Sequence, residues 1–474
     1  MSAPFFLLLI TLVTITVSVT FRNDTRAASI IAALGSFACG ILIFFVPIDQ
    51  AIDFLGISLK FDPSWQILGR ALALDDVTQP MVGFIYLSTG FLLLPAWLTG
   101  GSRYFPALAL ATAAAAAAAL MARPFLYAAI FIEFAAIGGG LILVSRRAPR
   151  NLGALRLLVL YTLAMLIILI TGWVLDQGSI TSTTTAMANR TTLALIFGFA
   201  VLILIPPFHI WLINASQEAH PYALAFVVLL LQSAAIFFLF RFLDVYPWLR
   251  GNPLAFQALR VGGMLCLAVG VPLAASQRDL SKVFAYMVIA DIGYSLLAVS
   301  AASTAGYRLA LGMTASRIIS LGVLSLGFSI LFGGEPQAKT RLQAGPHDLI
   351  PKIVVFAGML SLSGFPLTAG FPGRWSLLTN LLSSDSIDTY LAFLAYLGFC
   401  GTAIWWGYRL LRDQEWWEIG SFSIEQIFLF SGVVIIFLLG LFPQLTYPWI
   451  VDLGFRANEI VQLTHTPGGS GEVI

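Results

Sequence analysis

The sequence predicts an all-α polytopic membrane protein of about 14 transmembrane helices, and three observations lead to this prediction. Of its 474 residues, 59% are hydrophobic and only 10% are charged, whereas a soluble domain carries about 25% charged residues. Apolar stretches of roughly 20 residues, enough to cross a bilayer, recur along the whole chain. Prolines interrupt two of these stretches, and such broken helices mark ion paths in transporters.

The first three predicted spans cover 3–21, 28–48 and 77–99. The polar segment 49–76 lies between the second and the third. Its alternation of apolar and polar residues around Ile57–Phe61 indicates a short hairpin outside the bilayer.

The next ten spans form two groups of five. The predicted ranges are 104–121, 124–144, 155–175, 192–213 and 222–243, then 257–275, 280–301, 307–332, 352–382 and 389–411. A last span covers 426–446.

The two interrupted spans are the seventh and the twelfth. Pro206 and Pro207 break the seventh, and Pro366 and Pro372 break the twelfth, because proline lacks a backbone N–H and clashes with the preceding turn. The breaks lie five spans apart, so spans 4–8 and 9–13 are predicted to be repeats. An odd number of spans inverts the second copy relative to the first, as in many transporters.

The predicted spans and repeats divide the chain into four parts. They are the N-terminal spans (1–99), the first repeat (104–243), the second repeat (257–411) and the last span with its tail (426–474). Loops after odd-numbered spans hold more Lys and Arg than loops after even-numbered spans, so the former are expected in the cytoplasm. Both termini would then face outward, in a bacterial inner membrane.

Nothing in the sequence indicates a cofactor. Cys39, Cys266 and Cys400 lie in apolar segments without metal-site spacing, and there is no dinucleotide fingerprint, P-loop or haem motif. We therefore expect no cofactor or metal in this chain, and any redox chemistry is expected to belong to partner subunits.

Ionisable residues inside spans are costly and are functional candidates by default. Glu133 lies in the middle of the fifth span, and its alternatives are ion movement or a protonated or paired structural carboxyl. Asp291 and Arg317 lie within the tenth and eleventh spans and are candidates for a structural pair. Arg374 follows the second break. Arginine does not release its proton, so it suits a fixed counter-ion rather than a carrier.

Three further residues are weaker candidates for the ion path. Lys282 lies near a helix start and either takes part or extends to the interface. His209 and His220 titrate near neutral pH, yet a histidine beside a break also serves as a clamp on a carbonyl.

Several motifs resemble a known family, the antiporter-like subunits of respiratory complex I, which are shared with Mrp-type cation/proton antiporters and membrane-bound hydrogenases. The similar segments are Ile205–Leu212 with Glu218–Pro221, Ser276–Tyr286 with Ile292–Tyr294, Ala122–Arg123 with Glu133, and Ser361–Arg374. The resemblance spans roughly residues 70 to 415. It implies fourteen helices with inverted repeats, and a proton path along a central polar axis.

The chain departs from that family where the resemblance places its proton-carrying lysines. The span-seven lysine position falls on Leu202, and the span-eight position on Gln232 or Ser233. Arg374 stands at the span-twelve position. The resemblance also places Asp291 where a histidine is often found, and Arg317 where some members have a lysine.

Three hypotheses follow from the resemblance. The first is a membrane-arm subunit of an NADH–quinone or related redox complex, contributing to proton or sodium translocation through Glu133, Gln232, Asp291, Arg317 and Arg374. The second is a structural subunit without a complete path. The third is a subunit of an Mrp-type antiporter. Expected partners are other membrane-arm subunits, lipid and a quinone-reactive peripheral arm, with no nucleic acid.

Overall fold

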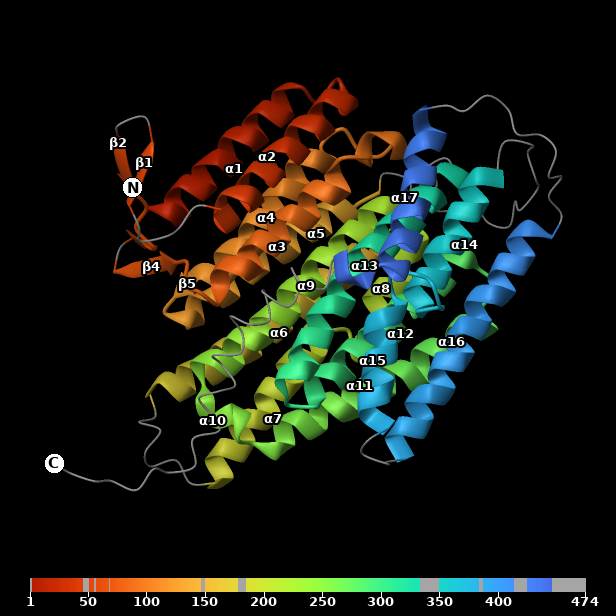
Figure 1. Cartoon of the computed structure of the whole chain (residues 1–474). Coiled ribbons are helices and arrows are strands. Elements are labelled where there is room, and N and C mark those ends of the chain that lie inside the picture. The colour runs from red at the N-terminus through yellow and green to blue at the C-terminus, as the bar shows by residue number, and fades with distance from the viewer. Residues whose placement is uncertain are drawn as a thin grey trace.

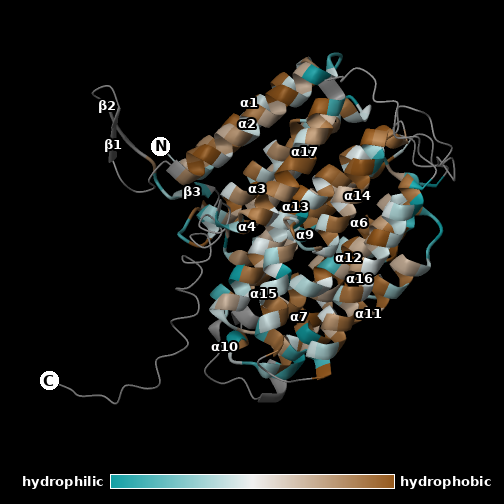
Figure 2. Ribbon diagram, turned by 45° about the vertical axis from the view of Figure 1, so that its right-hand side comes forward, coloured by the Kyte–Doolittle hydropathy of each residue, from teal (hydrophilic) through white to brown (hydrophobic). Residues whose placement is uncertain are grey.

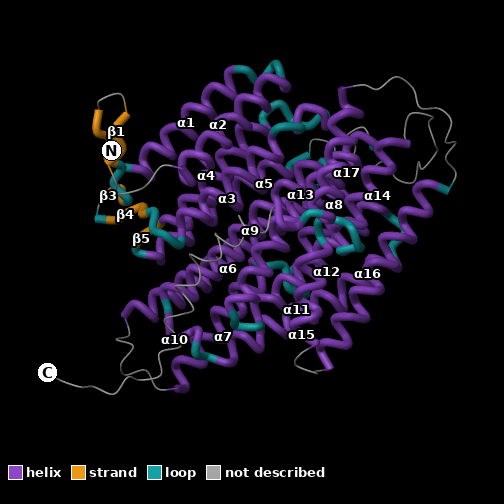
Figure 3. Tube along the Cα trace, viewed as in Figure 1, coloured by secondary structure: helices purple, strands orange, loops and turns teal. Residues whose placement is uncertain are grey.

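A computed structural model gives the fold of the chain and shows a bundle of long helices (Figures 1 and 3). The structure describes residues 2–45, 51–54, 57–67, 69–145, 150–177, 185–332, 349–382, 387–412 and 424–445. Residues 333–348, between the eleventh and twelfth predicted spans, lie outside these ranges.

The N-terminal part combines helices with small antiparallel sheets. Its helices are α1 (Ala3–Thr20), α2 (Thr25–Phe45), α3 (Thr78–Leu93) and the 3₁₀ helix η1 (Ala96–Thr99). Strands β1 (Ala51–Phe54) and β2 (Ile57–Lys60) pair as the predicted hairpin, which is thereby confirmed. Strands β3 (Ser64–Ile67) and β4 (Arg70–Ala73) form a second sheet with β5 (Ala122–Arg123).

The described residues of the first predicted repeat form seven helical elements. They are α4 (Phe105–Met121), η2 (Phe125–Tyr127), α5 (Ala128–Leu143), α6 (Leu152–Gln177), α7 (Thr185–Leu202), α8 (Ile210–Glu218) and α9 (Pro221–Val245). The seventh predicted span is thus split into α7 and α8, on either side of Pro206 and Pro207.

The described residues of the remaining part of the chain are mostly helical as well. Its elements are α10 (Pro247–Arg250), α11 (Pro253–Ser276), α12 (Leu280–Ser300), α13 (Thr304–Leu331), α14 (Leu349–Ser363), α15 (Phe371–Leu382), α16 (Ile387–Leu411), α17 (Ile424–Leu441) and η5 (Pro443–Leu445). The twelfth predicted span is split into α14 and α15, so an interruption is present at both predicted places.

Among the described residues, nine helices are long and apolar enough to cross a membrane, and shorter apolar helices accompany them. The most apolar windows of α9 and α12 are 100% and 94% buried, whereas that of α1 is only 28% buried. Helices α9 and α12 are therefore central. The outer helices expose large apolar side chains, such as Val159 and Leu394. Hydrophobic residues are common along the helices throughout the bundle (Figure 2).

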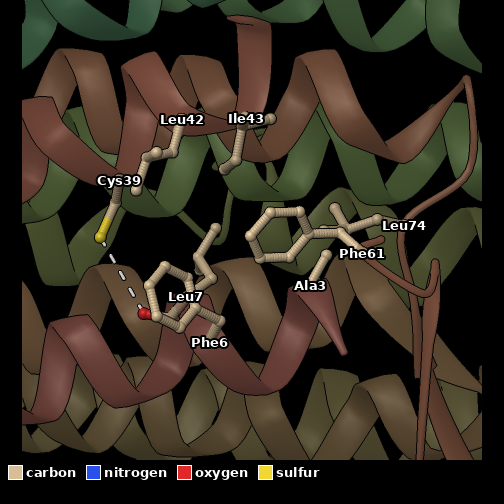
Figure 4. A pocket seen from close by; sticks show the side chains of 8 residues that line it. All are labelled: Ala3, Phe6, Leu7, Cys39, Leu42, Ile43, Phe61 and Leu74. Carbon is tan, nitrogen blue, oxygen red and sulfur yellow. Dashed lines mark hydrogen bonds between the residues drawn. The ribbon is translucent and has the colours of Figure 1, made fainter. Parts of the chain in front are cut away.

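An apolar pocket lies where α1 begins and α2 ends. Phe61 and Leu74 line it beside Ala3, Leu7 and further apolar residues (Figure 4). The thiol of Cys39 also faces the pocket and donates to the carbonyl oxygen of Leu7. The described residues that line this pocket are all uncharged.

An ionic cluster joins the second sheet to the end of α9. Arg241 is fully buried one turn before α9 ends, and it contacts Asp75 and Asp244. Asp75 also pairs with Arg123 of β5 and caps α3 by accepting from the backbone N–H of Thr78 at 2.8 Å. Burial opposes ionisation of Asp75, but Arg241, Thr78 and Arg123 outweigh it and hold the pKa of this carboxyl below its ordinary value.

Asp75→Asn is expected to lower the free energy of unfolding by about 1–2 kcal/mol, because it weakens the charge partner of a buried arginine at a site that solvent still screens. The pKa of Asp75 is lowered on folding, so its contribution is present above about pH 4 and is lost as the pH falls through the lowered pKa. Thermal unfolding in detergent at several pH values measures this. The exposed Asp62→Asn is the matched control, and an equal loss in both variants would contradict the prediction.

Candidate functional site

The first helix break, between α7 and α8, has a defined backbone conformation. Leu204 takes a left-handed conformation with φ of 69°. The N–H of Ile205 donates to the carbonyl oxygen of Ala200 at 3.0 Å. This six-to-one bond beside a left-handed residue is the Schellman pattern that ends many helices.

The second break, between α14 and α15, repeats this pattern. Gly364 takes the left-handed conformation with φ of 72°. The N–H of Phe365 donates to the carbonyl oxygen of Leu360 at 2.9 Å. The two interruptions are therefore built in the same way, with the left-handed residue in the same place.

Neutral side chains satisfy the carbonyl that the first break frees. Pro206 has no N–H to offer the carbonyl of Leu202, four residues earlier. That oxygen accepts from the hydroxyl of Tyr161 at 3.2 Å and from Nε2 of Gln232 at 3.1 Å. Gln232 and Leu202 are completely buried. The structure joins Leu202 and Gln232, the positions that the resemblance assigns to two lysines, in a neutral network.

At the second break, a charged side chain donates a hydrogen bond to the corresponding carbonyl. Nη1 of Arg374 donates to the carbonyl oxygen of Leu362 at 2.7 Å. The hydroxyl of Tyr396 donates to the carbonyl oxygen of Gly364 at 3.0 Å. A guanidinium therefore lies inside the bundle at the place where the first half has an amide and a phenol.

The carboxylate of Asp291 lies between two arginines. Its Oδ1 accepts from Arg374 and its Oδ2 from Arg317, and Arg317 also donates to the hydroxyl of Ser295. The side chains of Arg317, Arg374 and Asp291 are only 1%, 2% and 4% exposed. The predicted pair of Asp291 and Arg317 is confirmed, and Arg374 makes it a triad.

This Asp291–Arg317–Arg374 triad carries more positive than negative charge. Both arginines stay protonated, so an ionised Asp291 leaves one net positive charge. Nη1 of Arg317 and Nε of Arg374 have no hydrogen-bond partner among the described residues. Two aromatic rings stabilise the guanidinium of Arg374 by cation–π contacts. It lies 4.8 Å from the ring centre of Tyr294 and 5.2 Å from that of Phe399.

Glu133 lies apart from the triad, on an outward face of α5. Its Oε1 accepts from the hydroxyl of Thr162 of α6 at 2.6 Å, and its Oε2 has no partner among the described residues. The neighbouring Ile130 and Phe134 are 43% and 55% exposed. Glu133 is therefore a half-buried carboxyl surrounded by apolar surface.

Two of the three weaker candidates, Lys282 and His209, also lie outside the triad. Lys282 is in the first turn of α12, nine residues and about 14 Å before Asp291 along the helix. His209 precedes α8, with its ring centre 6.3 Å from that of Tyr286, and its Nδ1 has no partner among the described residues. Neither side chain contacts Asp291 in the described interactions.

The segment after α8 ties several helices together. Gln217 donates to Asp279 at the start of α12, at 3.2 Å. Glu218 accepts from the backbone N–H of Gly153 at the start of α6, at 2.8 Å. The ring of His220 donates to the carbonyl oxygen of Thr99 at 2.9 Å, and burial lowers the pKa of His220 despite this bond. These residues serve as structural connections, and His220 acts as the carbonyl clamp.

Several contributors were missed by the sequence analysis. Ser295 follows Asp291 by four residues on one helix, so helical spacing offered a signal for it. Tyr161 and Thr162 gave no such signal, because their partners lie on other helices. Within the described residues, no group of three or more His, Cys, Asp or Glu side chains is placed to hold a metal ion.

The fold and the site define a polytopic membrane protein with two interrupted helices and buried charges between them. The family described as "NADH:quinone oxidoreductase/Mrp antiporter, TM" matches residues 130–403, more than half of the chain. The chain belongs to this family. The resemblance noted in the sequence is thereby confirmed.

Curated relatives are chloroplastic NAD(P)H-quinone oxidoreductase subunits 5. The protein from Nuphar advena is 32% identical over 181 residues, which is 36% of this chain and 23% of that protein. The protein from Populus trichocarpa is 27% identical over 198 residues, 40% of this chain and 25% of that protein. The matched segment thus spans about a quarter of the length of these relatives.

Solved structures resemble nearly the whole chain. A chain of the Mrp complex from Dietzia sp. DQ12-45-1b has a TM-score of 0.76 at 17% identity, covering 98% of both chains. A chain of respiratory complex I from Thermus thermophilus has a TM-score of 0.74 at 21% identity, covering 97% of this chain and 100% of that one. A chain of an archaeal membrane-bound sulfane sulfur reductase has a TM-score of 0.79 at 14% identity, covering 97% and 98%. At these identities the likeness is one of fold.

Asp291→Asn is expected to destabilise the protein by about 3–5 kcal/mol, because two buried arginines lose their shared counter-charge. Replacing Arg317 by Met in the same variant should recover part of this loss, since one stranded charge is removed. Thermal unfolding of the purified protein measures both. A double variant no more stable than Asp291→Asn would contradict the proposed charge balance.

Proposed function

We propose that this chain is an antiporter-like membrane-arm subunit of an NADH–quinone or related redox-driven complex, and that it contributes to proton translocation. One observation carries the proposal: two interrupted helices with the same backbone pattern lie inside the bundle, and their freed carbonyls accept from polar side chains. Broken helices in an apolar medium belong where ions pass or bind.

The proposed architecture has fourteen spans and two inverted five-span repeats, 104–243 and 257–411, flanked by 1–99 and 426–474. The matching left-handed residues Leu204 and Gly364 support the repeats. The proposed location is a bacterial inner membrane with both termini outside, as the distribution of Lys and Arg favours.

The proposed path follows Glu133, Gln232 and Asp291, with Arg317 and Arg374 as fixed charges. Among these residues, only the two carboxyl groups have side chains that can both take up and release a proton. Leucine and glutamine carry no proton, so the stretch past Leu202 requires water as the carrier. His209 and Lys282 remain proposed flanking members of the path.

An alternative proposal is a structural subunit without a complete path. Complete burial of Leu202 and the neutral donors on its carbonyl favour this alternative. A second alternative is a subunit of an Mrp-type antiporter, which the similar fold of the Dietzia chain supports equally well. In the main proposal and the structural alternative alike, the redox chemistry resides in partner subunits and no cofactor belongs to this chain.

Glu133→Gln in the intact complex is expected to reduce the number of protons moved per electron, because it removes a carboxylate that takes part in the path. Proton uptake by proteoliposomes during single turnovers of the donor measures this ratio. Glu218→Gln is the matched control, since its side-chain oxygen still accepts from Gly153 and it lies outside the proposed path. An unchanged ratio in Glu133→Gln would favour the structural alternative.

Purifying the native complex through this chain separates the main proposal from the Mrp-type alternative. Copurification of a quinone- or hydrogen-reactive peripheral arm is the expected result. A complex that exchanges cations for protons without any redox subunit would contradict the main proposal.

A further inference from the structure

A groove lies between α13, the break before α15 and the end of α17. It holds about 500 Å³ of empty space, including its open side. Small side chains form the floor of the groove, and the guanidinium of Arg308 lies at one end of it. The lining includes Arg308, Gly312, Ala315, Ser316, Ala369 and Gly373.

The length of the groove matches one leaflet of a bilayer. Arg308 and Ile319 both line it and are eleven residues apart on α13, which corresponds to about 16 Å along the helix. The hydrocarbon core of a membrane is about 30 Å thick, so one leaflet measures about 15 Å. Arg308 lies in the second turn of α13, near the start of the helix. A side chain that contacts lipid headgroups is expected at such a position.

The surroundings of the groove are apolar. Leu367 in the break is 56% exposed, and Leu441 and Phe442 beyond the groove are 54% and 50% exposed. These side chains lie beside the end of α17, where η5 begins. A ligand with an apolar tail and an anionic head fits a groove with this lining.

We propose that the groove is a binding site for one anionic phospholipid. The phosphate contacts Arg308, and one acyl chain lies along Gly312, Ala315 and Ile319. Basic side chains between transmembrane helices are the features that hold anionic headgroups. Small side chains let the acyl chain approach the backbone of α13 closely, where a larger side chain would occupy the same space.

The lipid would support the second helix break from outside. Ala369, Pro372 and Gly373 line the groove, and Arg374 follows them directly. A lipid in the groove therefore packs against the segment that positions the guanidinium of Arg374. The proposal depends on the membrane location of the chain and not on whether it moves protons.

The test measures lipid retained by the intact complex. The complex is equilibrated in mixed phosphatidylglycerol and phosphatidylcholine, washed with detergent, and analysed by mass spectrometry. Arg308→Gln should retain about fivefold less phosphatidylglycerol, the loss expected for one headgroup contact of about 1 kcal/mol, whereas Arg308→Lys should retain it. Ala315→Phe fills the groove and should also release it, without touching the charge.

Arg103→Gln is the matched control, because Arg103 is an exposed arginine far from the groove in sequence. The Arg103→Gln complex should retain as much phosphatidylglycerol as the unaltered complex. If Arg308→Gln and Ala315→Phe each retained as much phosphatidylglycerol as the unaltered complex, the proposal would be overturned. Cross-linking of Ala315→Cys to another subunit would also overturn it, because a partner helix would then occupy the groove.

Discussion

Every backbone carbonyl that a helix break frees inside an apolar bundle must find a donor, and this constraint organises the centre of the molecule. The carbonyls of Leu202 and Leu362 are two examples. Each lies two residues before the left-handed residue of its break, Leu204 or Gly364. The backbone geometry is shared, so the difference between the two halves lies in the side chains that donate.

The choice of donor at the second break accounts for its charges. Arg374 donates to Leu362, and a guanidinium in that position requires a counter-charge. Asp291 supplies it and also accepts from Arg317, so one freed carbonyl is linked to three buried ionisable side chains. At the first break Gln232 and Tyr161 donate without charge, and no counter-ion is needed there.

The sequence predicted the parts of this arrangement that depend on local composition. Hydropathy predicted where the helices lie, and proline chemistry predicted both interruptions. The pairing of Asp291 with Arg317 was a candidate because each residue lies deep within an apolar helix. The second contact, from Arg374, arises only when α15 packs beside α12 and α13, and no local pattern encodes that packing.

Other contacts escaped prediction for a related reason. Arg241 lies near the end of α9, where a long side chain usually extends toward the interface. It is instead fully buried, because Asp75 and Asp244 receive it inside the protein. Likewise, a paired carboxyl was one of the alternatives for Glu133, but only the packing of α5 on α6 identifies Thr162 as its hydrogen-bond donor. The residues were visible in the sequence, whereas the distances between elements were not.

The unequal charges of the two halves set different conditions for a moving cation. Near the triad, one uncompensated positive charge at about 4 Å costs a cation roughly 4 kcal/mol at an effective dielectric constant of 20. Near Leu202 no such charge opposes it, yet no side chain there takes up a proton. In the proposed path, a proton would need water at the first break and a loosened contact between Asp291 and an arginine at the second. Under that proposal, control lies in the packing around α15 and α9 rather than in the acidity of any single residue.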